Sequence, residues 1–143
     1  MLLQYNKWLK YVLLFLVGGF AYGGIEIMSR GYSHISMFVA GGICFILIGL
    51  INETKSYEIA LIKQMVISAA IITAVELVTG LVVNVWLGLK VWDYSNRPLN
   101  FMGQICVLYT SIWFFLSPIA IILDDYLRYY ILGEDKKPHY KLL

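Results

Sequence analysis

Long apolar blocks are the feature that most constrains how this chain can fold. Four of them lie at residues 8–28, 35–51, 65–89 and 101–123, and the second is the shortest. A helix needs ~20 residues to cross ~30 Å of hydrocarbon, so each block comes close to one membrane span. The blocks lack the two-residue alternation of barrel strands, and a helix satisfies its backbone polar groups internally. The sequence therefore predicts an all-α, polytopic bundle of four spans over residues 1–132, followed by a short basic tail at 133–143.

Composition agrees with a chain that has lipid as its solvent. Hydrophobic residues make up 60% of the 143 positions and charged residues 14%. A soluble domain of this size needs more polar surface, so we expect the lipid bilayer to be the main partner. The formal charge of +2 gives no reason to expect nucleic acid as a partner.

The distribution of basic residues predicts the orientation in the membrane. The N-terminus, the second loop and the tail hold eight of them: Lys7, Lys10, Lys55, Lys63, Arg128, Lys136, Lys137 and Lys141. The first and third loops hold three: Arg30, Lys90 and Arg97. Because cytoplasmic loops are enriched in Lys and Arg, both termini are predicted to lie in the cytoplasm.

Several residues predict where helices end or bend. Gly31 interrupts the first block after Arg30, and Pro98 precedes a helix that Asn100 is expected to cap. Pro118 should kink the fourth span by freeing the carbonyl of Phe114, with Ser117 beside it to satisfy that oxygen. The charged residues where that span leaves the membrane are interpreted as a solvated end with exposed ion pairs: Asp124, Asp125 and Arg128.

Glu76 is the most informative polar residue because it lies about midway along the third apolar block. An ionised carboxylate costs at least ~2.5 kcal/mol at the bilayer centre, so it needs a partner, a cavity or a proton. Gly80 and Asn84 follow at steps of four, and Thr73 precedes on the same side. For a mid-membrane acid, a functional role is the default hypothesis.

The outer ends of the predicted spans gather further polar residues. Glu26 and Arg30 are spaced to pair on one helix face. Together with Glu76 they define a predicted outward-facing pocket for a small polar or charged ligand, made of Glu26, Arg30, Glu76, Asn84, Asp93, Asn96, Arg97, Asn100 and Gln104. The alternative is that the outer groups satisfy one another and fasten the helices together.

Small residues predict close approach between helices. Gly19 and Gly23 form a GxxxG step in the first span, and Gly41, Gly42 and Gly49 lie in the second. Packing within the bundle is one use of such residues, and formation of a homo-oligomer is the other.

Catalytic and metal-binding motifs are missing from the sequence. It contains no GxxxxGK[ST], HExxH or GxSxG, and Cys44 and Cys106 form no CxxC pair. We therefore expect neither a metal site nor a cofactor, and the sequence gives no positive reason to call the chain an enzyme.

A run of motif residues in the third loop resembles a known family. The run consists of Trp92, Asp93, Tyr94 and Ser95, then Pro98, Asn100, Gly103, Ile105, Cys106 and Trp113. Gly24, Ile25 and Glu26 followed by Arg30, and the acid at Glu76, also resemble this family of small bacterial membrane proteins, described as type IV ABC-transporter permeases. Many members have Leu-Pro after the motif cysteine, where this chain has Val107 and Leu108.

The resemblance implies a permease-like transport subunit in the bacterial cytoplasmic (inner) membrane, together with a separate ATPase or membrane partner. Two other classes stay open from the residues themselves. One is an intramembrane enzyme acting on a lipid or isoprenoid, with Glu76 or Asp93 as general acid or base. The other is a structural or regulatory membrane subunit. An apolar groove that opens sideways to lipid and ends at a carboxylate would favour the enzyme.

Overall fold

Four long helices make up the fold. The computed structural model describes residues 6–54, 59–134 and 137–143. The helices are α2 (Lys7–Arg30), α3 (Ile35–Thr54), α4 (Leu61–Gly80) and α5 (Val107–Tyr126). Two π-helical segments continue the last two helices, η1 (Leu81–Trp86) and η2 (Leu127–Ile131). Two-residue strands, β1 (Asn100–Phe101) and β2 (Ile105–Cys106), pair antiparallel in the third loop. The prediction of an all-helical chain is confirmed.

Three of the helical segments are long and apolar enough to cross a membrane. Within the residues described, these are Lys7–Arg30, Leu61–Trp86 and Val107–Ile131. The apolar part of α3, Ile35–Ile51, is shorter than the ~20 residues of a full span. The chain is therefore a membrane protein with at least three candidate spans, and the fourth span stays a prediction.

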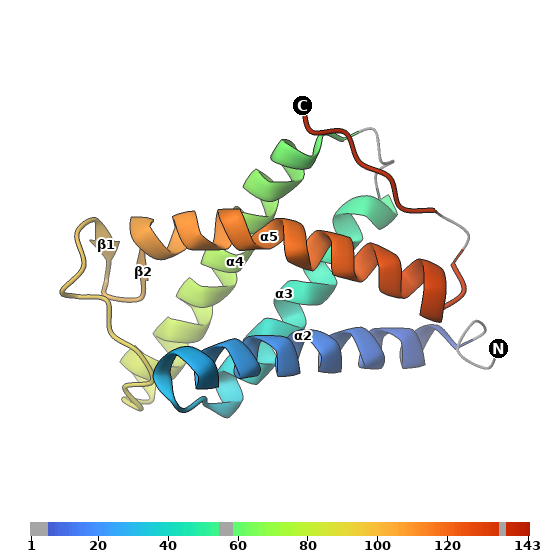
Figure 1. The fold of residues 1–143 in the computed structure, drawn as a ribbon. Helices are drawn as coiled ribbons and strands as arrows, with labels where there is room; N and C mark the ends of the chain where they lie inside the picture. The colour runs from blue at the N-terminus through green and yellow to red at the C-terminus, as the bar shows by residue number, and fades with distance from the viewer. Residues whose placement is uncertain (1–5, 55–58, 135–136) are drawn as a thin grey trace.

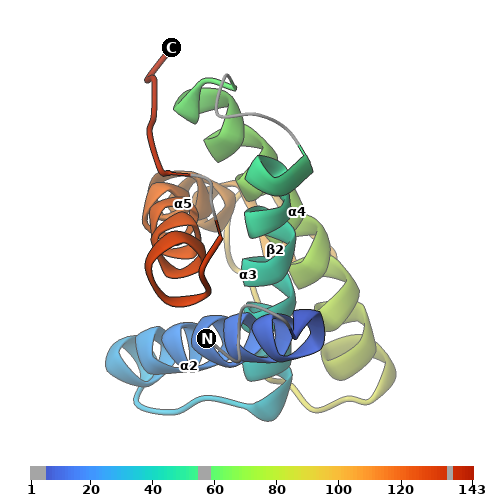
Figure 2. The ribbon, with the colours of Figure 1, turned by 90° about the vertical axis from the view of Figure 1, so that its right-hand side faces the viewer.

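α3 is the central helix, because it packs against α2, α4 and α5. Figure 2 shows α3 between α5 on one side and α4 on the other, with α2 crossing below them. In Figure 1, α2 and α5 run in opposite directions across the front, while α3 and α4 pass behind α5. The main contacts of α2 are with α3, and those of α5 are with α4.

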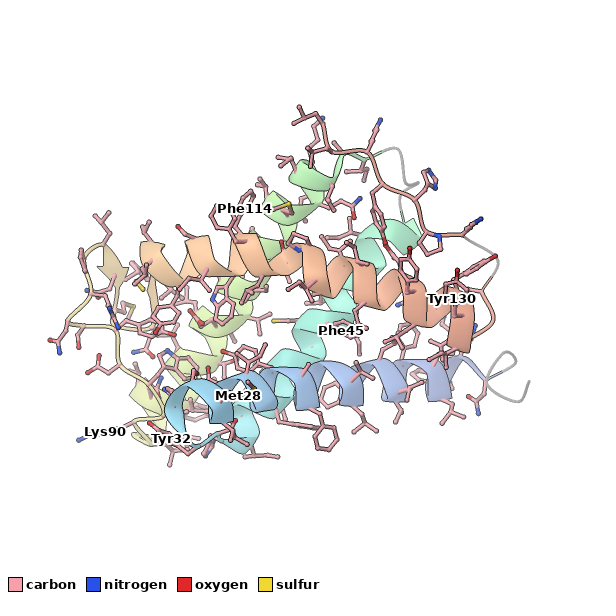
Figure 3. All side chains as sticks on the ribbon, viewed as in Figure 1. Met28, Tyr32, Phe45, Lys90, Phe114 and Tyr130 are labelled. Atoms are coloured by element: carbon pink, nitrogen blue, oxygen red, sulfur yellow. The ribbon has the colours of Figure 1, made fainter. Side chains whose placement is uncertain are left out.

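Interactions between distant residues define two ends of the bundle. At the loop end, formed by residues 31–34 and 87–106, Arg30 of α2 donates a 3.3 Å hydrogen bond to the carbonyl of Val91. At the terminal end, formed by the start of α2, the start of α4 and residues 132–134 and 137–143, Lys10 Nζ lies 3.6 Å from Glu134 Oε1. Figure 3 shows Tyr32 and Lys90 at the loop end and Tyr130 at the terminal end. The first and third loops thus share one end, as the predicted topology requires.

Glycines bring α2 and α3 into close contact. A Cβ at Gly18 would overlap the side chain of Phe45 and the carbonyl of Gly41, and one at Gly19 would overlap Phe38. Gly41 and Gly42 face α2 in the same way, against Tyr22 and Phe15. Gly18 and Gly19 of α2 and Gly41 and Gly42 of α3 are therefore used for packing within the bundle, whereas Gly24 has no atom near the place of a Cβ.

The end of α2 and the hydrogen bond beside Pro118 in α5 follow local chemistry. Gly31 ends α2 with a left-handed φ of 81°, and its N–H donates to the carbonyl of Ile27. Ser117 Oγ donates a 2.8 Å hydrogen bond to the carbonyl of Phe114, the oxygen freed by Pro118. The predicted helix end at Gly31 and the predicted contact of Ser117 with the Phe114 carbonyl are confirmed, and the kink at Pro118 stays a prediction.

The predicted start of the last span is wrong. α5 begins at Val107, not at Asn100, and residues 100–106 form the β1–β2 pair instead. Asn100 does not cap the helix, because its amide donates to the carbonyl of Arg97 and its Oδ1 accepts from the N–H of Gly103. The left-handed φ of 71° at Gly103 also prevents a helix from running through this segment.

The interpretation of Asp124, Asp125 and Arg128 as a solvated end is also wrong. These side chains are buried, with Asp124 0% and Arg128 5% exposed. Arg128 Nε lies 3.0 Å from Asp124 Oδ2, and Tyr140 of the tail donates a 2.8 Å hydrogen bond to Asp125. Gly49 of α3 leaves room for the Asp124 carboxylate, which a Cβ at that position would overlap. The interior of the bundle therefore extends to the terminal end.

The described part of the basic tail folds back onto the bundle. The N–H of Leu61 donates a 2.8 Å hydrogen bond to the carbonyl of Lys141, and the N–H of Ile62 donates to the carbonyl of Leu142. These donors belong to the first turn of α4, whose N–H groups have no partner inside the helix. The tail thus caps α4. Lys55 and Lys136, which support the predicted orientation, lie outside the described residues.

Candidate functional site

Glu76 lies on the face of α4 that packs against α5. The residue is 7% exposed, and its Oε2 accepts a 3.2 Å hydrogen bond from the indole Nε1 of Trp113. One turn earlier on each helix, the hydroxyls of Thr73 and Thr110 are 2.9 Å apart. These two polar contacts set the register of α4 against α5 and hold the carboxyl group in the middle of the bundle.

A cavity of about 170 Å³ lies beside this carboxyl group. Its wall is formed by side chains of α2, α3, α4 and α5, and by Trp92 of the third loop. Most of the wall is apolar, and Glu76 is the one Asp, Glu, Lys or Arg among the described residues that line it. The residues that line the cavity include Tyr22, Ile25, Ala40, Glu76, Trp113 and Ile119.

The second oxygen of Glu76 lacks a hydrogen bond within the described residues. Oε1 is buried and makes no hydrogen bond of ordinary geometry there, whereas Oε2 is bound to Trp113. The Tyr94 side chain is the other hydrogen-bonding group close to this carboxyl. Ser117, another polar residue of the wall, already donates to the Phe114 carbonyl. A buried carboxylate oxygen without a donor is unfavourable, so this atom is a point where a ligand group would be stabilised.

Glu26 and Arg30 form an ion pair at the loop end of α2. Arg30 Nε lies 2.8 Å from Glu26 Oε2, as the i, i+4 spacing predicts. Arg30 also stacks 4.7 Å from the centre of the Tyr32 ring. With the bond to Val91, these contacts join the first loop to the third, so both side chains are occupied in holding the loops together.

Asn84 and Gln104 form a second polar group, between η1 and the third loop. Asn84 Nδ2 donates a 2.8 Å hydrogen bond to Gln104 Oε1, and Asn84 Oδ1 accepts from the N–H groups of Val91 and Trp92. The indole of Trp92 in turn donates to the carbonyl of Gln104. Gly80 makes this approach possible, because a Cβ there would lie 2.5 Å from Gln104 Oε1.

The remaining loop residues fold the loop itself. Asp93 accepts hydrogen bonds from the hydroxyl and the N–H of Ser95, which hold the pKa of Asp93 below its usual range. The N–H of Tyr94 donates to the carbonyl of Gly103, and the Tyr94 ring stacks on Tyr109 with centroids 4.6 Å apart. These contacts show that the motif residues of the third loop stabilise the fold of the loop itself.

The nine predicted pocket residues thus separate into several groups. Glu26 pairs with Arg30, Asn84 pairs with Gln104, and Asn100 binds the loop backbone. Asp93, Asn96 and Arg97 are exposed, and the Arg97 guanidinium lies 5.8 Å from the centre of the Tyr109 ring. Glu76 alone of the nine lines the cavity.

Trp113 is a site residue whose role could not be predicted from the sequence. In the sequence, Trp113 is one aromatic residue of an apolar span and one position of the family motif. Nothing in the sequence shows that its indole contacts Glu76, which lies 37 positions earlier. Tyr22 and Cys44, which also line the cavity, carry no local signal either. Covariation between homologous sequences is the kind of signal that could pair Glu76 with Trp113.

The fold and this buried site define a class: a small polytopic α-helical membrane protein with a carboxylate inside its bundle. Comparison with known protein families identifies the family within this class. The profile of the family described as "Putative ABC-transporter type IV" matches residues 25–133, most of the chain, so the chain belongs to this family. The match includes Glu26, Glu76 and the Trp92–Trp113 motif region. No solved structure matches the chain.

Proposed function

We propose that this protein is a permease-like membrane subunit of a transport system and that Glu76, with the adjoining cavity, is its ligand site. Membership of an ABC-transporter-type family and the apolar helices support a transport-related membrane protein. The observation that carries the site is the buried Glu76 carboxyl group, which faces a cavity with one oxygen lacking a described donor. Buried ionisable groups inside membrane spans commonly mark ligand or ion pathways.

In this proposal the polar residues of the loop end have a supporting role. The Glu26–Arg30 pair and the Asn84–Gln104 pair tie the third loop over the bundle on the outer side, above the cavity. The proposed pocket is therefore smaller and more apolar than the nine-residue pocket expected from the sequence.

The proposal also includes partners. The sequence contains no nucleotide-binding loop, so an ABC-type system would need a separate ATPase subunit. Four helices are few for a complete pathway, and we propose a second copy or another membrane subunit beside this one. The expected location is the bacterial cytoplasmic membrane, with both termini inside.

Reconstitution tests the function. Proteoliposomes containing wild type, Glu76→Gln or Glu134→Gln would be loaded with a panel of small solutes, and exchange across the membrane would be followed without added nucleotide. We expect one or more solutes to exchange faster than in protein-free liposomes, with loss of that exchange in Glu76→Gln alone. Glu134 is a matched acid at the terminal end, away from the cavity. Equal exchange by all three proteins and by empty liposomes would contradict transport by this chain or by an oligomer of it.

One observation favours a second candidate, the intramembrane enzyme. The cavity is apolar, it ends at a carboxylate, and two of its lining residues, Ile25 and Ile119, are exposed on the bundle surface. A lipid chain entering there would meet Glu76, which could act as a general acid or base. Incubation with bilayer lipids, followed by mass spectrometry of the products from wild type and Glu76→Gln, separates this candidate from a transport subunit. A lipid product that depends on Glu76 would favour the enzyme.

A further inference from the structure

The wall of the Glu76 cavity and its one acid define the chemistry of a ligand. The wall is almost entirely hydrocarbon and aromatic, so it favours an apolar body. Its volume of about 170 Å³ is similar to that of the engineered ~150 Å³ protein cavity known to bind benzene. The cavity therefore has room for a group about the size of one aromatic ring.

The acid specifies the polar end of such a ligand. Glu76 Oε1 makes no hydrogen bond of ordinary geometry within the described residues, and no described basic side chain lines the cavity. The Tyr94 side chain, the other hydrogen-bonding group close to the carboxyl, is uncharged and leaves room for a cationic partner. A buried charge is stabilised most by a partner of opposite charge that also donates a hydrogen bond. A protonated amine meets both requirements, whereas a second carboxylate would be repelled.

The route into the cavity is sideways, from the lipid. Ile25 of α2 and Ile119 of α5 both line the cavity and are 48% and 65% exposed. The two helices pack mainly on α3 and α4 and leave the cavity open between them. This surface lies along the apolar spans, where a membrane would supply acyl chains in place of water. A molecule dissolved in the bilayer can therefore reach Glu76 without passing the polar loop end.

We infer that the Glu76 cavity binds a membrane-dissolved amphiphile whose ring-sized apolar body fills the cavity and whose protonated amine pairs with the Glu76 carboxylate. This inference rests on the proposed function, because it names the ligand class of the same site. Trp113 orients the carboxyl group by holding Oε2, which leaves Oε1 for the amine. The aromatic rings of Trp113 and Tyr22 in the wall add a favourable surface for a cation.

Binding to the full-length protein in lipid nanodiscs tests the inference. Radiolabelled benzylamine, benzyl alcohol and benzoate would be compared by equilibrium dialysis, with empty nanodiscs subtracted to remove partition into lipid. We expect saturable benzylamine binding to wild type, at least tenfold weaker binding to Glu76→Gln, and unchanged binding to Glu134→Gln. Benzyl alcohol should bind equally to wild type and Glu76→Gln, because it lacks the charge, and benzoate should not bind.

A second variant keeps the test decisive if Glu76→Gln folds poorly. Ala40→Leu retains the acid and adds volume to the cavity wall, so it should abolish binding of both benzylamine and benzyl alcohol. Benzylamine binding that is not saturable above the blank, or that survives unchanged in either cavity variant, would overturn the inference. Saturable amine binding without any solute exchange in proteoliposomes would contradict transport alone. Glu76-dependent exchange of another solute, without amine binding, would contradict the amine inference alone.

Discussion

At the scale of single residues, the indole of Trp113 donates the hydrogen bond that holds Oε2 of Glu76. Removing a hydrogen bond to a buried acid leaves that acid unsatisfied at a cost of about 1–3 kcal/mol. We therefore expect Trp113→Phe to lower the free energy of unfolding by this amount, measured by denaturation of the protein in detergent micelles. Trp86→Phe is the control, because Trp86 is 79% exposed. Equal stability of the two variants would show that the Trp113–Glu76 bond contributes nothing.

The buried ion pair at the terminal end leads to a second prediction. Arg128→Met leaves the Asp124 carboxylate buried without its arginine, and breaking a buried pair in this way costs about 3–5 kcal/mol. Replacing both partners, as in Asp124→Leu with Arg128→Met, should recover much of that loss. The same unfolding measurement applies, with the exposed arginine variant Arg97→Met as control. Arg128→Met with wild-type stability would instead support a solvated end.

At the scale of elements, the contact between α2 and α3 depends on glycine. A Cβ at Gly18 would overlap Phe45, so Gly18→Ala should destabilise the protein by about 1–3 kcal/mol through overpacking. Gly24→Ala, on the same helix but with nothing within 4 Å of the added Cβ, should be neutral or slightly stabilising. Thermal unfolding in micelles measures both.

Cross-linking in native membranes should show the same oligomeric state for wild type and Gly18→Ala. Selective loss of an oligomer in Gly18→Ala would mean that Gly18 also serves an interface between chains.

At the scale of the whole molecule, the two ends of the bundle should lie on opposite sides of the membrane. The basic residues predict that the loop end faces outward. In a Cys44→Ala, Cys106→Ala background, a membrane-impermeant maleimide should label Asn96→Cys in intact cells. Lys7→Cys should be labelled only after the cells are permeabilised. The reverse pattern would invert the orientation, and labelling of both sites in intact cells would contradict the four-span topology.

Features that depend on neighbours along one helix were predictable from the sequence. The Glu26–Arg30 pair, the end of α2 at Gly31 and the Ser117–Phe114 bond beside Pro118 all follow from spacings of one to five residues. The apolar blocks likewise predicted the helices, because hydrocarbon demands long segments without charge. The exact start of α5 was not predictable, because Asn100 suits a turn as well as a helix cap.

The sequence by itself determined that the chain is helical, that its apolar segments suit a membrane, and that an acid at position 76 must be accommodated within one of them. These conclusions follow from composition and helical period alone. Only the tertiary structure decided that Trp113 binds this acid, that the polar residues of the loop end bind one another and the loop backbone, and that Asp124 and Arg128 are buried. The physical reason is that contacts between helices depend on how the helices cross and in which register, and neither is encoded in any short stretch of sequence.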